Sequence, residues 1–157
     1  MVELDSTDLQ ILDILQTDAS LSNQALAARL GISAATCLRR VKRLTQQGII
    51  ERVVAILSPD HLGQGLTAVM EVSLERQGAE HLAQFEALAV QRPEVQQCYQ
   101  VSPGPDFVLI AQLPDMPAYH RMAQELLTQH ANVRHVKAYF SVRRGKFNTR
   151  WSLPAAN

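Results

Sequence analysis

A stripe of arginines between residues 33 and 47 carries the clearest chemical signal in this chain of 157 residues. At about 100° per residue, one side of a helix here would be polar or cationic, with spacings i, i+3, i+4 and i+7: Thr36, Arg39, Arg40 and Arg43. The other side would be apolar and would join a core: Cys37, Leu38, Val41 and Leu44. Guanidinium groups bind phosphate oxygens in pairs and read guanine edges in the major groove. The stripe therefore predicts a recognition helix for double-stranded DNA.

The alternative interpretation is that the arginines form only the solvated face of an amphipathic helix. Such a face normally mixes charges of both signs, whereas residues 33–47 contain no acid. The segment from Arg29 to Arg52 is strongly basic, although the formal net charge of the whole chain is zero. We therefore favour DNA binding. Ser33 and Thr36 are further candidates for phosphate or base contacts, although helix capping alone would account for Ser33.

Helix signals before the stripe place it in a unit of three helices. The first helix is expected over residues 5–16, where apolar residues form one broad face. Ser22 is a suitable N-cap for a short second helix, and Gly31 follows it as a residue suited to the left-handed conformation. Ser33 then caps the third helix, which Gly48 closes. A short capped helix, a glycine turn and a basic helix are typical of a helix-turn-helix.

The chain changes character after the third helix. Residues 49–57 are rich in Ile and Val and are predicted to be extended. Residues that favour turns follow them: Ser58, Pro59, Asp60, Gly63 and Gly65. We place a domain boundary here, which gives a winged-type helix-turn-helix domain over residues 1–60 and a second domain over residues 61–157.

The second domain alternates between strand and helix patterns. In order, these are a strand (67–74), a helix (78–92), strands (95–102 and 107–113), a helix (119–127) and a strand (136–142). This βαββαβ order predicts a ferredoxin-like domain and an α+β chain. Two helices cover only one face of such a sheet, and residues 107–111 are apolar at every position. The uncovered face is expected to meet a second subunit in a homodimer or larger assembly.

Short motifs run through both domains: Leu4-Asp5, Asp8, Ile11-Leu12, Leu30-Gly31-Ile32-Ser33, Cys37-Leu38-Arg39-Arg40-Val41, Leu44, Gly48-Ile49-Ile50, Leu57-Ser58-Pro59, Val101-Ser102, Asp106-Phe107, Leu113-Pro114-Asp115-Met116 and Tyr119. In combination they resemble the leucine-responsive and asparagine regulator family, Lrp/AsnC. The resemblance implies a dimer with two helix-turn-helix heads, commonly assembled into octamers. It also implies that the ferredoxin-like domain senses small molecules, usually amino acids.

The resemblance further implies an effector site between subunits, near the turn that links the second and third strands. The matching residues are Ser102, Gly104, Asp106 and Asp115. The family commonly has Gly where this chain has Pro103, so the backbone of the turn is expected to differ. Val136 and Ala138 stand where effector-binding relatives carry hydroxyl groups. We therefore expect a less polar pocket, adapted to an amino acid with an apolar side chain.

Simpler roles remain open for the two acids. Asp115 precedes Pro117 at a position suited to a helix N-cap, and Asp106 is a common turn residue. A rival hypothesis follows, in which the second domain assembles the protein on DNA as an architectural factor and responds to no small molecule.

Other classes of protein are disfavoured. Cys37 and Cys98 are too few for a disulfide framework or a zinc site and are expected to be buried thiols in a reducing compartment. The five histidines show no metal-ligand spacing, and no motif of a nucleophilic triad occurs. We expect no catalytic residue, metal or cofactor. Without a long apolar run or a signal peptide, the protein is expected to be cytoplasmic.

A second basic cluster lies near the C-terminus, with aromatic residues between the cations: Arg143, Arg144, Lys146, Phe147, Arg150 and Trp151. Such a tail could contact DNA or a neighbouring subunit. Its position after the last strand favours packing on the dimer.

Overall fold

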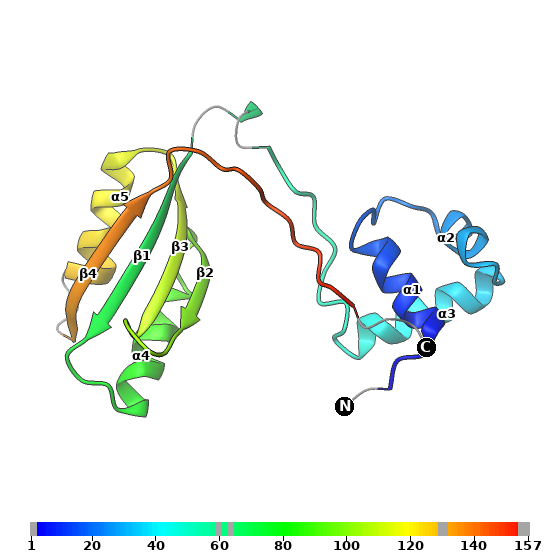
Figure 1. Cartoon of the computed structure of the whole chain (residues 1–157), viewed down its shortest axis with the longest axis horizontal. Coiled ribbons are helices and arrows are strands. Elements are labelled where there is room, and N and C mark those ends of the chain that lie inside the picture. Colours follow the sequence, from blue (N-terminus) through cyan, green and yellow to red (C-terminus); the bar gives the residue numbers. More distant parts are fainter. Residues whose placement is uncertain (1–2, 59–60, 63–64, 129–131, 154–157) are drawn as a thin grey trace. The chain divides into compact units, whose positions relative to one another are not determined.

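The computed structural model describes residues 3–58, 61–62, 65–128 and 132–153. The chain divides into two compact units (Figure 1). One unit comprises Met1–Ile56 with Lys146–Asn157, and the other comprises Leu57–Gly145. In the described part of the chain, no helix is long and apolar enough to cross a membrane.

The terminal segment of the chain contacts the helical unit. The second domain was predicted to cover residues 61–157, and within that range the segment from Lys146 groups with the helices. Its Arg150 pairs with Asp13 of the first helix at 2.8 Å. The predicted turn residues Pro59, Asp60 and Gly63 lie outside the described residues.

The N-terminal unit contains the three predicted helices: α1 (Ser6–Leu15), α2 (Asn23–Leu30) and α3 (Ala34–Gln46). Each begins after a residue whose side-chain oxygen accepts a hydrogen bond from the backbone of the first turn: Asp5, Ser22 and Ser33. The helices enclose a small core: Ile11, Leu26, Ala27, Cys37 and Leu44. The capping residues and the apolar spacing therefore set the limits of these helices.

The turn between α2 and α3 is fixed by hydrogen bonds on both sides. Gly31 adopts φ 65°, the left-handed conformation expected of it. The N–H of Ile32 then donates to the carbonyl of Ala27 at 3.1 Å. The side-chain amide of Asn23 donates to the carbonyl of Ala34 at 2.8 Å, which ties the start of α2 to the start of α3. The two helices are thereby held at a defined angle.

The second unit has the predicted order of strands and helices: β1 (Leu66–Leu74), α4 (Ala79–Ala89), β2 (Val95–Gln100), β3 (Phe107–Leu113), α5 (Met116–Ala123), a π-helical turn (Gln124–Thr128) and β4 (Val133–Phe140). The strands pair in the order β2-β3-β1-β4, and every pair is antiparallel. This confirms the ferredoxin-like prediction. Residues 49–57, predicted to be extended, belong to no helix or strand.

One face of the sheet forms the core of this unit. Met70, Val72 and Leu109 are fully buried beneath residues of the helices such as Phe85 and Met122. Figure 1 shows α4 and α5 on the same side of the sheet.

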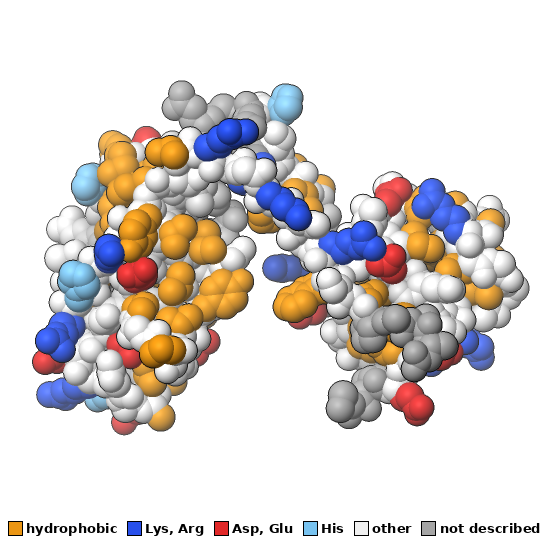
Figure 2. Space-filling model, viewed as in Figure 1, with side chains coloured by type: hydrophobic (Ala, Val, Ile, Leu, Met, Phe, Trp, Pro, Cys, Tyr) orange, Lys and Arg blue, Asp and Glu red, His pale blue; other side chains and the backbone are white. Residues whose placement is uncertain are grey.

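Neither α4 nor α5, the α-helices of the described part of this unit, lies over the opposite face of the sheet (Figure 1). The register places Val69 of β1 beside Ile110 of β3 and Tyr139 of β4, with Val108 and Tyr99 next to them. Figure 2 shows hydrophobic side chains over the strands of this unit. We refer to these five residues as the open sheet face. Its apolar character agrees with the pattern predicted for a surface that meets another subunit.

Candidate nucleic-acid interface

The third helix presents a cationic surface that differs in part from the predicted stripe. Its buried side is narrow and consists of Cys37, Leu44 and the half-buried Val41. At 100° per residue, Arg39 lies almost directly opposite this side and is exposed, as predicted. Leu38 was predicted to join the core, which is wrong, since 58% of it is exposed. It lies about 90° from the centre of the buried side.

Two of the predicted DNA contacts, Arg40 and Arg43, are engaged within the unit. Asp8 of α1 is only 1% exposed. Its Oδ1 atom accepts a hydrogen bond from Nη1 of Arg40 at 2.9 Å, and its Oδ2 atom contacts Nη2 of Arg43. Arg40 also pairs with Asp5 at 2.6 Å. We call these four residues the charge hub.

The charge hub changes the electrostatics expected of α3. A buried carboxylate requires cationic or hydrogen-bonding partners, and Asp8 obtains both from α3. The hydrogen bond from Arg40 lowers the pKa of Asp5, so this carboxylate stays ionised at neutral pH. The same two acids raise the pKa of Arg40. Both arginines are therefore paired with carboxylates within the unit. The residue pattern of α3 alone does not reveal these pairs, because the acids lie at the start of α1.

The exposed cations beside α3 were only partly anticipated. Arg39 remains from the predicted set, while Lys42 on α3 and Arg29 at the end of α2 are also exposed. Lys42 lies about 60° from Arg39 on the helical wheel. Lys42 was not part of the predicted stripe, because it lies outside the series i, i+3, i+4 and i+7 that starts at Thr36. Together these three residues form the cationic surface of the helix-turn-helix.

The start of α3 is organised by the two predicted hydroxyl residues. The Oγ atom of Ser33 accepts a hydrogen bond from the N–H of Thr36 at 3.1 Å. The two hydroxyl oxygens are also hydrogen-bonded, at 2.9 Å. The cap accounts for Ser33, as the simpler interpretation held, and Thr36 is half-buried. Ala34 and Ala35 next to them are exposed and small, so a ligand can approach the helix backbone closely here.

Three of the four predicted effector residues lie in or beside the turn between β2 and β3. The turn between β2 and β3 contains Ser102 and Gly104, both exposed, with Gly104 at φ 122°. Oδ2 of Asp106 accepts hydrogen bonds from the N–H of Leu74 at 2.7 Å and from the side chain of Gln77 at 3.3 Å. Asp106 therefore fastens the turn to the end of β1.

Asp115 lies apart from the other three effector candidates. It caps α5, where Oδ1 accepts a hydrogen bond from the N–H of Ala118 at 2.8 Å. Asp106 directly precedes β3 and Asp115 follows it, and a strand of seven residues is about 20 Å long. One chain thus does not bring the two acids together. A site that used both would need residues from two subunits.

The two apolar residues predicted to make the effector pocket less polar are half-buried. Val136 and Ala138 pack against the core of the second unit, on the side of the sheet that faces the helices. Val136 pairs with Val72 of β1, which also pairs with Phe107, so it lies at the same end of the sheet as Asp106.

The structure offers little for catalysis in the described part of the chain. No group of three or more His, Cys, Asp or Glu residues there could hold a metal ion. Burial raises the pKa of the Cys37 thiol. Burial, together with the charge of Glu86, raises the pKa of Cys98. Both thiols are therefore protonated at neutral pH and poorly nucleophilic.

Comparison with known proteins covers both units. Residues 4–51 match the family described as winged helix-turn-helix DNA-binding, and residues 67–151 match the Lrp/AsnC ligand binding domain. An HTH-type transcriptional regulator of Haemophilus influenzae is 37% identical over 140 residues, which cover 89% of this chain and 83% of the relative. The leucine-responsive regulatory protein of Escherichia coli is 36% identical over 137 residues, which cover 87% of this chain and 84% of the relative.

Solved structures show the same fold. A transcriptional regulator from Neisseria meningitidis, determined as an L-Met complex, has a TM-score of 0.85 and 34% identity, and the match covers 97% of both chains. An AsnC family transcriptional regulator from Agrobacterium tumefaciens has a TM-score of 0.86 and 29% identity, with 95% of this chain and 97% of that chain covered.

The charge hub predicts a specific loss of stability. Replacing Asp8 with Asn removes the charge that Arg40 and Arg43 share, and should lower the free energy of unfolding of the N-terminal unit by about 2–3 kcal/mol. Hydrogen–deuterium exchange of α1 and α3 at increasing urea concentrations would measure this free energy of unfolding in the full chain. Glu3→Gln removes the same charge at an exposed position of the same unit and should change stability by less than about 0.5 kcal/mol. Equal stabilities for the two variants would show that the hub does not stabilise the unit.

Proposed function

The chain belongs to the Lrp/AsnC family of transcription regulators and is not an enzyme, and we propose that it acts in the cytoplasm by binding specific sites on double-stranded DNA. The observation that carries this proposal is the exposed, cationic side of α3. There Arg39 and Lys42 are exposed, while the neighbouring Arg40 and Arg43 are held by the carboxylates of α1.

Arg39 and Leu38 are the base-reading residues in this proposal. A helix that enters the major groove directs the exposed residues of its first turns toward the base edges. Arg39 is suited to the acceptor atoms of guanine, and the exposed side chain of Leu38 to the methyl group of thymine. Ser33 and Thr36 lie at the same end of α3. Lys42 is placed for phosphate contact, which fixes orientation without reading sequence.

Arg40 and Arg43 act as positioning residues in this scheme. Their guanidinium groups bridge α3 to Asp8, so they set the orientation in which Arg39 is presented. Arg43 is 43% exposed at its side chain and has room for an additional phosphate contact at its outer edge. Loss of either arginine is therefore expected to weaken DNA binding through the fold.

The open sheet face supports a homodimer as the binding species. Val69, Val108 and Ile110 form an apolar surface on central strands, on the side of the sheet opposite α4 and α5. A second copy that packs on this face would bring two helix-turn-helix units into one molecule. Such a dimer binds half-sites about one helical turn apart, so the operator should be roughly palindromic. Assembly of dimers into an octamer would extend contact over several such sites.

An amino-acid effector is the regulatory part of the proposal. The relative from Neisseria meningitidis is an L-Met complex, and the relative from Escherichia coli is named leucine-responsive. Both names point to an amino acid with an apolar side chain. In this chain the site would combine Ser102, Gly104 and Asp106 from the turn with Asp115 from another subunit, because one chain holds the two acids at opposite ends of β3.

An architectural role without an effector is the second candidate function. It is favoured by the hydrogen bonds that occupy Asp106 and Asp115 within the chain. If the effector proposal holds, isothermal titration with the twenty amino acids gives heat for at least one apolar member, and that ligand changes DNA affinity in a mobility shift, as linkage requires. Retained DNA binding with no heat from any amino acid would favour the architectural role.

Replacing Arg39 with Ala should weaken specific DNA binding by about 1–3 kcal/mol, because a base-reading contact is lost. The stability of the N-terminal unit should not change, since Arg39 is exposed. Fluorescence anisotropy with labelled promoter DNA over a series of salt concentrations measures the affinity. Arg134→Ala, on the exposed edge of β4, is the control and should bind as the wild type does. Unchanged affinity for Arg39→Ala would remove Arg39 from the interface.

Replacing Ile110 with Asp places a charge at the centre of the open sheet face and should yield a monomer. Light scattering at micromolar concentration measures the mass, and circular dichroism shows whether the sheet is retained. Val142→Asp is the control because Val142 is fully exposed. A monomeric wild type, or the same mass for wild type and Ile110→Asp, would rule out the dimer proposed for this face.

A further inference from the structure

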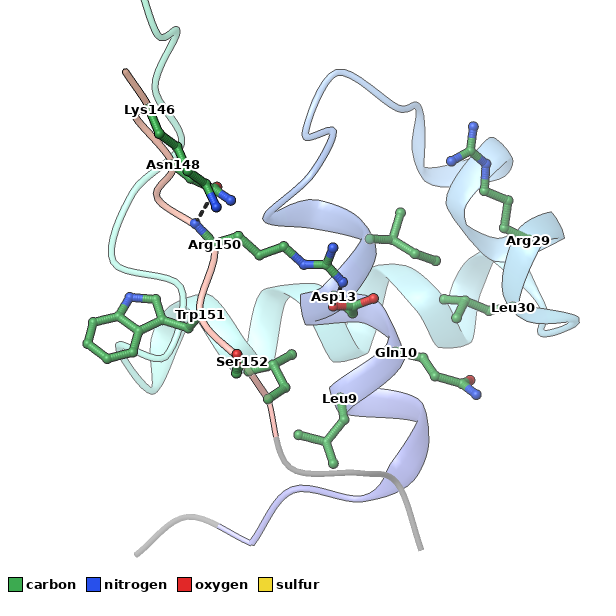
Figure 3. A pocket seen from close by; sticks show the side chains of 12 residues that line it. Leu9, Gln10, Asp13, Arg29, Leu30, Lys146, Asn148, Arg150, Trp151 and Ser152 are labelled. Atoms are coloured by element: carbon green, nitrogen blue, oxygen red, sulfur yellow. Dashed lines mark hydrogen bonds and ion pairs between the residues drawn. The ribbon is translucent and has the colours of Figure 1, made fainter. Parts of the chain in front are cut away.

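The C-terminal strap, residues 146–153, is fastened to α1 by three polar contacts. Nη2 of Arg150 pairs with Oδ1 of Asp13 at 2.8 Å. The side chain of Gln16 donates to the carbonyl of Trp151 at 3.0 Å and accepts from the N–H of the same residue at 2.9 Å. The side-chain amide of Gln16 thus pairs with both backbone groups of one strap residue. Figure 3 shows Arg150 reaching from the strap toward Asp13.

The strap also forms one wall of a groove. The opposite wall comprises Leu9, Gln10, Asp13 and Ile14 of α1 with Arg29 and Leu30 of α2, and the open groove has a volume of about 880 Å³. The strap therefore lies beside the helices and is held at a few points. Trp151 is 80% exposed, so polar contacts, and not burial of this residue, hold this part of the strap.

The polar contacts between the strap and α1 are weak enough to break. The side chains of Asp13 and Arg150 are each about half exposed, at 49% and 50%. An exposed ion pair changes an equilibrium by about fivefold at most. Arg150 lowers the pKa of Asp13, so the pair is fully charged at neutral pH and is sensitive to salt. The strap is therefore fastened weakly enough to be released by a modest change elsewhere in the chain.

The strap is joined directly to the sheet of the second unit. Strand β4 ends at Phe140, and the N–H of Ser141 still donates to the carbonyl of Thr67 in β1 at 2.9 Å. The strap begins at Lys146, so a few residues separate it from the sheet. The chain crosses between the units twice, once after Ile56 and once before Lys146. The second crossing, residues 141–145, connects β4 to the strap.

The helix that holds the strap is the helix that positions α3. Asp13 follows Asp8 on α1, Gln16 directly follows the helix, and Asp8 holds Arg40 and Arg43 of the third helix. A covalent and polar path thus runs from β4 through the strap to α1, and from α1 through the charge hub to the cationic face of α3.

We propose that the C-terminal strap is a releasable latch through which the second unit regulates DNA binding. This inference rests on the proposed function. In the docked state the strap holds α1, and this is the state that binds DNA well. Release of the strap from Asp13 and Gln16 frees α1 and lowers DNA affinity. By linkage, DNA favours the docked strap to the same degree.

The latch can be tested with the single tryptophan of the chain, which lies in the strap. Arg150→Glu places two acids together at the latch and should undock the strap. Time-resolved anisotropy of Trp151, without DNA or effector, should then show more fast local motion. DNA affinity should fall by about two- to fivefold, the range of an exposed ion pair. The double variant Asp13→Arg with Arg150→Glu restores the ion pair with reversed charges. It should return both the local motion of Trp151 and the DNA affinity to the values of the wild type.

The matched control is Arg143→Glu, which makes the same change of charge at an exposed position that precedes the strap. Equal Trp151 motion and equal DNA affinity for Arg150→Glu and Arg143→Glu would overturn the latch. Increased Trp151 motion in Arg150→Glu with a DNA affinity equal to that of the control would also overturn it, since docking would then have no regulatory effect. Failure of the wild type itself to bind DNA would contradict the proposed function and, with it, the latch.

Discussion

The buried carboxylate of Asp8 is the constraint on which the helix-turn-helix depends. The apolar core of this unit is small, and apolar side chains tolerate small rotations of one helix against another. Charge-assisted hydrogen bonds to two guanidinium groups do not tolerate them, because both distance and direction are fixed. Asp8 accepts such bonds from Arg40 and Arg43, so α3 is held to α1 at one rotation about its axis. That rotation directs Arg39 and Lys42 to solvent.

Local patterns predicted most of the fold. Helix caps at Ser22 and Ser33 depend on adjacent residues, and the alternation of residues 67–74 depends only on the strand itself, so both are visible in the sequence. The function of the arginines was not visible in this way. Arg40 and Arg43 share a helical stripe with Arg39, but their carboxylate partners lie more than thirty positions away on another helix. Helical periodicity contains no information about such contacts.

The candidate effector residues show a related limit. A resemblance to a family identifies Ser102, Gly104, Asp106 and Asp115 as a group, yet a single chain places Asp106 and Asp115 at opposite ends of β3. Their grouping makes physical sense only if the open sheet face brings a second subunit close to the first. Oligomeric assembly and ligand binding would then be one property of the second unit, since the site would exist only in the dimer.

The C-terminal strap makes the helical unit depend on segments that lie far apart in the chain. During synthesis α1, α2 and α3 leave the ribosome before the sheet and can close their core early, since domains generally fold as units from the N-terminus. Asp13 and Gln16 cannot meet Arg150 and Trp151 until the intervening sheet has been synthesised. A chain that stops within the sheet would carry a folded helix-turn-helix without its strap. The strap contact is therefore a late step in the folding of a unit whose other parts are made early.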